Sequence, residues 1–302
     1  MSTVSLHSSP QGVTLGIVGL GLVGRALASR LKLAGYTCNG FDVNPDAIAN
    51  FAALGHATSS SVSELASQVS ILVLTVFDTA GVLQVVEELL SCKVPESHFT
   101  LMDCSTGEPE QLEALSKRLK PLGIDYIEAP LSGSSLQIEK GEATMLLGGD
   151  AMVIAALQPL LSAMASAQIH VGPAGMAARA KLATNLVLGL NRTALAEGMV
   201  FAESLGIAPA TFLELVLATP ASSEAAKVKG AMMVSENFAP QSRIRQHLKD
   251  VHIMLAMAKD AQQDLPLSQT HAKLMQNAIQ AGDGELDNAA IIQQIRREKL
   301  KS

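Results

Sequence analysis

Two polar side chains within a largely apolar segment are the residues of this sequence best suited to acid–base chemistry. Lys181 and Asn185 lie four residues apart in residues 172–205, a stretch rich in Ala, Leu, Met and Val. Because four residues make about one helical turn, a helix would present both side chains on one face. A lysine removed from water has a lowered pKa and can carry a proton to and from a substrate. The alternative is a half-buried helix from which the ammonium of Lys181 reaches solvent.

Residues 172–205 themselves predict one long helix. The segment starts with Gly172-Pro173, where a helix N-terminus is expected, and Gly206 follows its end, where a C-cap glycine belongs. It is apolar over most of its circumference, so we expect it to be buried on most sides. Its longest uncharged run, residues 182–191, is too short to span a bilayer.

A second pattern, near the N-terminus, predicts a binding site for a dinucleotide. An apolar strand at residues 13–18 is followed by a G-x-G-x-x-G turn, a helical pattern and a second strand at residues 37–41. The glycines permit a tight turn, close approach of a pyrophosphate and close helix–strand packing, and the helix N-terminus favours the anion. We therefore expect the turn to contact the cofactor through Gly19, Leu20, Gly21, Leu22, Val23 and Gly24.

The acidic residue that ends the second strand favours NAD over NADP. Asp42 can accept hydrogen bonds from the adenosine ribose hydroxyls and would repel a 2′-phosphate. No arginine follows it in residues 43–45 to bind such a phosphate. The alternative is that Asp42 is a helix N-cap or turn residue before Pro45.

The order of strands and helices predicts two domains. Strands are expected at residues 71–75, 100–103, 125–128, 143–147 and 169–171, each separated from the next by a loop or helix. After residue 171 only helical patterns remain. We therefore predict an α/β Rossmann dinucleotide-binding domain (residues 13–172) and an all-α C-terminal domain (residues 173–302), joined by the long helix. Residues 1–12 are predicted to be a disordered leader.

Composition and charge exclude several classes of function. The 302 residues are 48% hydrophobic and 17% charged, as in a globular protein, and a net charge of −6 without a basic cluster argues against nucleic-acid or membrane partners. The N-terminus lacks the basic and apolar regions of a secretory signal, and the three cysteines are odd in number and scattered, so we expect a cytoplasmic protein. The seven histidines show no metal-binding spacing, so no metal site is expected.

Three further features are ambiguous on their own. Cys104 could be a nucleophile, but no activating base lies near it in the sequence, so a small buried thiol is the favoured interpretation. The turn at residues 129–135 offers N–H groups and hydroxyls that could hold a carboxylate, although most such turns are only turns. The pair Lys249-Asp250, at the start of an amphipathic stretch, would by itself indicate a solvated helix face.

Five motifs, taken together and in order, resemble those of the β-hydroxyacid dehydrogenase family, which includes 3-hydroxyisobutyrate dehydrogenase and tartronate semialdehyde reductase. The resemblance covers nearly the whole chain. The motifs are GIVGLGLVG (residues 16–24), DCSTGEP (103–109), EAPLSGS (128–134), GPAGMAARAKLATN (172–185) and FAPQSRIRQHLKD (238–250).

The resemblance implies roles for the matching positions. Lys181 matches the catalytic lysine, and Asn185 matches the residue that orients the substrate and the lysine. Lys249 matches a lysine near the nicotinamide and the substrate, and Asp250 is its usual companion. The loop that holds the substrate carboxylate corresponds to Ser132, Gly133 and Ser134. The positions expected beside the cofactor are Val76, Phe77, Thr106 and Lys249.

The resemblance also implies the activity: NAD-dependent hydride transfer between a small 3-hydroxy acid and its 3-oxo acid or semialdehyde. The apolar long helix and the second domain, rich in Ala and Met, separately predict a homodimer or homotetramer with helices at the interface. The chain departs from the family pattern at Ser134, Val23, Ser242 and Gln246, and the added polar groups point to a polar substrate. The members that act on 6-phosphogluconate are much longer, and the imine reductases lack the lysine. The alternative function is an NAD(H)-binding regulatory protein of the same fold without turnover.

Overall fold

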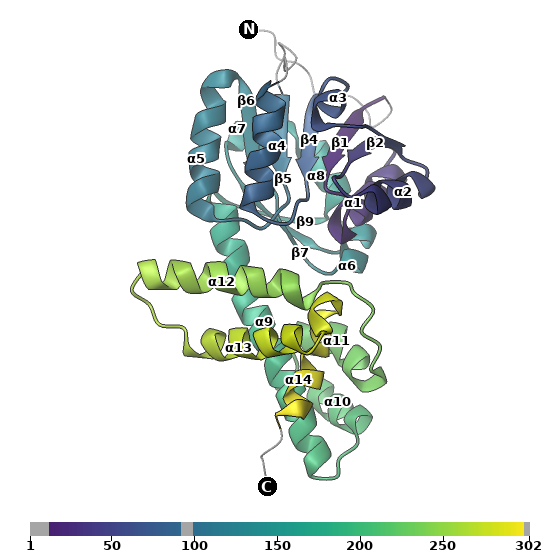
Figure 1. Ribbon diagram of the computed structural model, residues 1–302, viewed down its shortest axis with the longest axis vertical. Coiled ribbons are helices and arrows are strands. Elements are labelled where there is room, and N and C mark those ends of the chain that lie inside the picture. The colour runs from purple at the N-terminus through teal and green to yellow at the C-terminus, as the bar shows by residue number, and fades with distance from the viewer. Residues whose placement is uncertain (1–11, 92–98, 299–302) are drawn as a thin grey trace. The chain divides into compact units, whose positions relative to one another are not determined.

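The computed structural model describes residues 12–91 and 99–298, and the chain divides into two compact units (Figure 1). Unit 1 is Met1–Lys181 and unit 2 is Leu182–Ser302. The predicted fold class, a Rossmann domain followed by a helical domain, is confirmed. The predicted boundary near residue 172 stays a prediction, and the predicted leader lies outside the described residues except for Gly12. Cys92 also lies outside them.

Within the described residues, the strands of unit 1 form one nine-stranded sheet. Its order is β3-β2-β1-β4-β5-β6-β8-β7, and β9 pairs with β8. The first six strands are parallel, with Ile17 opposite Gly40 and Val73, whereas β8 runs antiparallel to β6 and β7. The strands are β1 (Thr14–Val18), β2 (Thr37–Phe41), β3 (Ala57–Thr58), β4 (Ile71–Leu74), β5 (Phe99–Asp103), β6 (Ile124–Glu128), β7 (Leu131–Ser132), β8 (Thr144–Gly148) and β9 (Ala167–Gly172).

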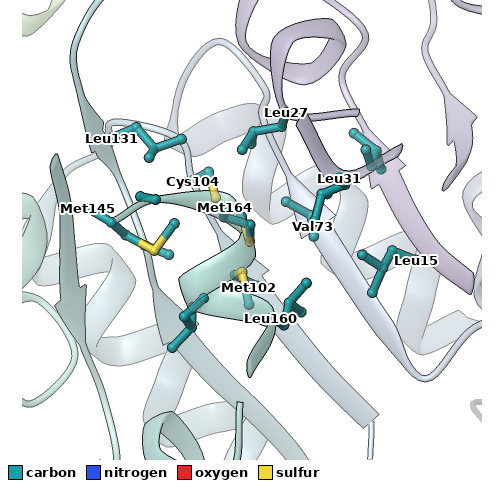
Figure 2. Packing of buried hydrophobic residues seen from close by; sticks show 14 of the residues in the cluster. Leu15, Leu27, Leu31, Val73, Met102, Cys104, Leu131, Met145, Leu160 and Met164 are labelled. Carbon is teal, nitrogen blue, oxygen red and sulfur yellow. The ribbon is translucent and has the colours of Figure 1, made fainter. Parts of the chain in front are cut away.

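Helices cover both faces of this sheet, as the continuous apolar strands require. On β4, Ile71 and Val73 pack into one core and Leu72 and Leu74 into the other, because successive strand side chains point to opposite faces. Figure 2 shows the first core, where Leu27 and Leu31 of one helix lie near Val73. The helices are α1 (Leu22–Leu33), α2 (Pro45–Ala53), α3 (Val62–Ala66), α4 (Thr79–Ser91), α5 (Pro109–Leu119), η1 (Lys120–Leu122), α6 (Ser135–Lys140), α7 (Ala151–Ala156) and α8 (Gln158–Met164).

Within its described residues, unit 2 is built of helices joined by loops, and it has its own apolar core. That core includes Leu195, Met199, Met233, Met254 and Ile292. Helices α12 and α13 lie side by side (Figure 1). The prediction that this half is helical is confirmed. The elements are α9 (Met176–Ser204), α10 (Pro209–Ala218), α11 (Glu224–Ser235), α12 (Ile244–Asp260), α13 (Pro266–Gln280), η2 (Asp283–Glu285), η3 (Asn288–Ala290) and α14 (Ile291–Arg297).

The long helix α9 differs from its prediction at its start and in its burial. It begins at Met176 rather than near residue 172, because Gly172 and Gly175 have φ values of +136° and +90°, outside the helical region. Its predicted end is confirmed by Gly206, which has a φ of +82°. One side of the helix is buried, whereas Val187 and Phe201 on the other side are 56% and 63% exposed. Among the described residues, no helix has the length and apolarity needed to cross a bilayer.

Candidate active site

The glycine turn after β1 has the geometry of a dinucleotide-binding loop. Gly19 has a φ of +94°, and a side chain at Gly24 would collide with the carbonyl oxygen of Gly19, so both positions require glycine. Gly21 is the N-cap of α1 without a side-chain cap, and a Cβ built there meets nothing within 4 Å. The first N–H groups of α1 therefore face open space at the positive end of the helix dipole. These features fit the pyrophosphate of a dinucleotide.

Asp42 is joined directly to this turn. Its Oδ2 accepts a hydrogen bond from the Leu20 N–H at 2.6 Å, and its Oδ1 accepts one from the Asn44 N–H at 2.8 Å. The N-cap of α2 is Asn44, whose side chain accepts from the Asp46 N–H, so Asp42 does not cap the helix. Its bond to the Asn44 N–H does make Asp42 a turn residue before Pro45, the other form of that alternative. Asp42 also holds the second strand's end against the glycine turn, where a ribose next to the pyrophosphate would lie.

The loops that follow β4 and β5 meet at the same edge of the sheet. The Thr75 hydroxyl donates to the Gly19 carbonyl, and the Val76 N–H donates to the Ser105 hydroxyl at 3.1 Å. Phe77, at 48% exposed, is a large apolar side chain held at this carboxyl edge, where parallel sheets bind their ligands. Thr106 follows Ser105 and is partly buried. Unit 1 thus gathers the predicted cofactor positions other than Lys249 along one sheet edge.

The candidate catalytic lysine lies beside the candidate carboxylate loop in unit 1. Lys181 is 7% exposed, and its Nζ donates a hydrogen bond of 2.6 Å to the carbonyl oxygen of Leu131. Leu131 immediately precedes Ser132, so the ammonium is fixed at the start of the loop. The lysine therefore does not extend into solvent from a half-buried helix.

The loop itself is shaped by a capped helix. The Ser134 hydroxyl accepts the Gln137 N–H and the Gln137 side chain accepts the Ser134 N–H, which makes a capping box for α6. Gly133 is exposed, and a Cβ there would lie 2.9 Å from the Cβ of Ala143. Ser132 and Gly133 therefore present the accessible polar groups of the loop, whereas the Ser134 side chain also holds the turn.

A buried carboxylate fixes the start of α9. Glu128, at the end of β6, accepts hydrogen bonds from the N–H groups of Gly175 and Ala178, the latter at 3.0 Å. Burial raises the pKa of Glu128 to about 7, against the lowering effect of these backbone hydrogen bonds. The helix start that Glu128 holds lies about one turn before Lys181, so this carboxylate positions the lysine.

Unit 2 brings together the remaining predicted residues. The Asn185 side-chain amide donates to Asp250 Oδ2 at 3.2 Å, and Lys249 Nζ lies 3.0 Å from Asp250 Oδ1. Asn185 and Asp250 are buried, and Lys249 is nearly so, which differs from the solvated helix face that the Lys-Asp pair indicates by itself. Asp250 joins the asparagine of α9 to the lysine of α12.

Cys104 is a buried free thiol. Burial, and the neighbouring Asp103 carboxylate as a smaller cause, raise its pKa well above the ordinary value, which disfavours the nucleophilic thiolate. The predicted small buried thiol is confirmed.

Comparison with known proteins agrees with this architecture. Residues 14–172 match the family model described as the NAD binding domain of 6-phosphogluconate dehydrogenase. Residues 175–295 match the one described as NAD-binding of NADP-dependent 3-hydroxyisobutyrate dehydrogenase. The 2-hydroxy-3-oxopropionate reductase of Escherichia coli (strain K12) is 28% identical over 282 residues, covering 92% of this chain and 96% of the relative.

Two further proteins extend the comparison. L-threonate dehydrogenase of Cupriavidus necator is 27% identical over 282 residues, covering 92% of this chain and 94% of the relative. The crystal structure of 3-hydroxyisobutyrate dehydrogenase from Salmonella typhimurium superimposes with a TM-score of 0.83 at 28% identity, covering 93% of this chain and 99% of the other.

The fold and the glycine turn define a pyridine-nucleotide-dependent oxidoreductase. The family models and relatives cover nearly the whole described chain and agree on one group of enzymes. The chain belongs to the β-hydroxyacid dehydrogenase family and is a hydroxyacid dehydrogenase.

Two residues of the site lie outside the sequence-based predictions. Thr75 is predicted only as the last residue of the strand at residues 71–75, and its type does not indicate its contact with Gly19. Glu128 lies in the motif at residues 128–134, but the resemblance assigns it no role. Its position directly after the buried strand residue Ile127 could have indicated a buried carboxylate. A buried carboxylate needs hydrogen-bond partners, so a positioning role could have been inferred.

Proposed function

We propose that the protein is an NAD-dependent dehydrogenase that interconverts a small 3-hydroxy acid and its 3-oxo acid or semialdehyde, with Lys181 as general acid and base. The observation that carries the proposal is the buried Lys181 Nζ, held 2.6 Å from the Leu131 carbonyl oxygen at the start of a small-residue loop. A lysine fixed beside a carboxylate-binding loop can reach the hydroxyl next to that carboxylate.

In this proposal the chain's own residues hold the substrate and move one proton. Ser132, Gly133 and Ser134 hold the substrate carboxylate through backbone N–H and hydroxyl groups. A nicotinamide coenzyme held by the glycine turn would supply the hydride acceptor for the C–H bond at C3. Neutral Lys181 accepts the hydroxyl proton at Nζ, and the Leu131 carbonyl oxygen stabilises the resulting ammonium by accepting a hydrogen bond from it. In the reverse direction the ammonium returns this proton to the carbonyl oxygen.

Asn185 serves as a positioning residue in the same proposal. It lies one turn after Lys181 on α9, and Asp250 fixes its amide. Lys249 is held by the same carboxylate and is proposed to contact the substrate and the nicotinamide. Val76, Phe77 and Thr106 are proposed as the remaining cofactor contacts beside the glycine turn.

NAD is the proposed cofactor because of the carboxylate of Asp42. It stands at the end of β2 beside the glycine turn, and Val43, Asn44 and Pro45 supply no cation for a 2′-phosphate. The family model that names NADP-dependent enzymes makes this a question for measurement.

The experiment is a spectrophotometric panel with purified protein. NAD and NADP are offered separately with D- and L-3-hydroxyisobutyrate, glycerate, threonate, serine and 3-hydroxypropionate. We expect NAD-linked turnover of at least one of these acids. Tight NADH binding without turnover of any 3-hydroxy acid would instead favour a regulatory protein of the same fold.

The largest expected effect is that of removing the lysine. Lys181→Ala should lower kcat by roughly 1,000-fold, because a positioned acid–base group contributes about 100- to 10,000-fold. NADH binding, followed by fluorescence titration, should change little. Lys140→Ala, an exposed lysine of α6, is the matched control and should leave both quantities unchanged. Equal losses of turnover and NADH binding in Lys181→Ala would show a structural lysine.

We also propose a homodimer or homotetramer in the cytoplasm. The exposed apolar side chains Val187 and Phe201 on α9 support an interface between copies of the chain. The free buried thiols Cys38 and Cys104 fit a reducing compartment. Sedimentation as a monomer at micromolar concentration would contradict the oligomer.

A further inference from the structure

The helix that follows the glycine turn carries an arginine near the end where its dipole favours an anion. Arg25 is the fourth residue of α1, which begins at Leu22 and has no acidic residue in its first turn. The N-terminal end of a helix is the positive end of its dipole, so a cation there is unfavourable unless an anion lies beside it. The other basic residues of α1, Arg30 and Lys32, lie in its last turn, where the dipole favours them. Arg25 is therefore the exception on this helix.

The guanidinium of Arg25 is held against the glycine turn. Its Nη1 donates a hydrogen bond of 2.7 Å to the carbonyl oxygen of Leu20, five residues earlier in the chain. Helical side chains lean toward the N-terminus of their helix, so the side chain reaches back over the first turn of α1. It is partly buried along this path. The cation is thus fixed at the end of α1 where the first N–H groups lie.

Arg25 has no carboxylate partner in the part of the chain that the structure describes. The cations that form ion pairs in residues 12–91 and 99–181 are Lys117, Arg118 and Arg179. Asp42 accepts a hydrogen bond from the N–H of Leu20, the residue whose carbonyl binds Arg25, but the two charged side chains form no ion pair there. A guanidinium has five N–H donors, and the printed contact uses one of them.

The place of Arg25 points to the phosphate groups that NAD and NADP share. The first N–H groups of α1 face open space at Gly21 and fit a pyrophosphate, and residues 14–172 belong to a nucleotide-binding family. Asp42 ends β2, on the side of the adenosine ribose, to which the 2′-phosphate of NADP is attached. Arg25 instead projects from α1 onto the turn itself.

We propose that Arg25 binds the pyrophosphate of the nicotinamide coenzyme. This inference rests on the coenzyme binding in the proposed function, and it does not depend on the identity of the substrate. The pyrophosphate is the anion that the positive end of α1 and the guanidinium both require, and arginine binds phosphate oxygens through charge-assisted hydrogen bonds. Arg25 therefore contributes to the affinity for both coenzymes, whereas Asp42 contributes to the choice between them.

Three substitutions separate the charge of Arg25 from its contact with the turn. Arg25→Met removes the charge and the donors and keeps an apolar stem. Arg25→Lys keeps the charge, and Arg25→Gln keeps an N–H donor for the Leu20 carbonyl without the charge. Arg30→Met is the matched control, because Arg30 lies on the same helix and also donates to a backbone carbonyl, that of Ala163 at 2.8 Å.

Binding is measured without turnover. Fluorescence titration gives the affinities for NADH and NADPH, and displacement of NADH gives those for ADP-ribose, which contains the pyrophosphate, and adenosine, which lacks it. We expect Arg25→Met to weaken binding of NADH, NADPH and ADP-ribose by a common factor of roughly 10- to 30-fold, the loss of a charge-assisted hydrogen bond. The affinity for adenosine should change by less than about twofold, because adenosine has no phosphate for the guanidinium to bind.

The other variants should divide by charge. Arg25→Lys should keep part of the affinity for NADH, Arg25→Gln should resemble Arg25→Met, and Arg30→Met should stay within about twofold of the wild type. The affinity of the wild type for NADH should also fall more steeply with ionic strength than that of Arg25→Met, since salt screens the contact between charges.

Thermal unfolding separates this role from a structural one. Without coenzyme, the melting temperature of Arg25→Met should stay close to that of the wild type, because the loss of one hydrogen bond is offset by removal of a cation from the positive end of α1. The rise in melting temperature that a fixed concentration of NADH produces should be smaller in the variant.

Two kinds of result would overturn the inference and leave the proposed function standing. Full affinity for NADH in Arg25→Met or Arg25→Gln would show that the charge does not bind the coenzyme. A loss confined to NADPH would assign the guanidinium to the 2′-phosphate. Failure of the wild type to bind either NADH or NADPH would instead contradict the proposed function itself.

Discussion

The two units hold their buried charges in different ways. In unit 1, Lys181 is held by the Leu131 carbonyl and Glu128 by N–H groups at the start of α9. In unit 2, buried charges are held by other side chains, as Lys229 and Asp287 hold each other. Unit 1 therefore positions these buried charged groups through backbone N–H and C=O groups, whose geometry a strand and a turn already determine. Unit 2 adds pairs of oppositely charged side chains to such backbone contacts, so a single substitution leaves a buried charged partner uncompensated.

Breaking the best-connected pair of unit 2 should have the largest effect on stability. Asp287→Ala removes a carboxylate that holds Lys229 and three backbone N–H groups. The free energy of unfolding should fall by about 3 to 5 kcal/mol, because a buried cation loses its partner. Urea denaturation measures this. The control is Glu285→Ala, whose exposed ion pairs with Arg243 and Arg245 should account for less than about 1 kcal/mol.

In unit 1, the corresponding test is a dependence of stability on pH. Burial raises the pKa of Glu128 from 4.5 to about 7, so between these values the folded state keeps a proton that the unfolded state releases. The contribution of Glu128 to stability is thus largest at low pH, falls as the pH rises from about 4.5 to about 7, and is level above that. The total change is on the order of 3 kcal/mol.

Glu128→Gln should remove this component. Urea unfolding of the wild type and the variant between pH 5 and pH 8 measures it, and the exposed Glu139→Gln is the control. Parallel curves for Glu128→Gln and the wild type would mean that the backbone hydrogen bonds, and not burial, dominate at this carboxylate.

The smallest expected effect is a change in the pKa of His271, a buried histidine of unit 2. Burial, with the charge of Arg192 as the second cause, lowers the pKa of His271 from 6.5 to about 4. His271 therefore costs stability as the pH falls from about 6.5 to about 4, because only the unfolded state gains a proton there. Arg192→Met should raise the pKa of His271 partway toward 6.5, since burial remains. NMR titration of the imidazole measures this, and an unchanged pKa would place the guanidinium away from the ring.

The sequence allowed the framework of unit 1 to be predicted because its signals are local. The glycine turn, Asp42 and the apolar run of β4 each lie within a few adjacent residues, and the structure places them as expected. The start of α9 was predicted too early, because a Gly-Pro pair signals a helix start without excluding a left-handed glycine three residues later. The two-residue strands β3 and β7 carry too few residues to show a pattern.

The network of unit 2 could not be predicted in the same way. Asn185 and Asp250 are 65 residues apart, and Lys229 and Asp287 are 58 residues apart. Charged residues on helices are usually solvated, so the types of Arg192, Lys229 and Asp287 give no sign of burial. The family resemblance assigned Lys249 and Asn185 a role, but their shared contact with Asp250 is visible only once the helices are packed.

The contact between Asp42 and the Leu20 N–H has a consequence for redesigning coenzyme preference. Because the carboxylate also braces the glycine turn, replacing it to admit a phosphorylated coenzyme would remove an acceptor that the turn depends on. Asp42→Ala would then weaken binding of both NAD and NADP, even though it removes the repulsion between the Asp42 carboxylate and the 2′-phosphate of NADP. A change of coenzyme preference therefore has to remove the negative charge and keep a hydrogen-bond acceptor for the Leu20 N–H. Asp42→Ser, which keeps a short side-chain oxygen near Leu20, separates these two effects.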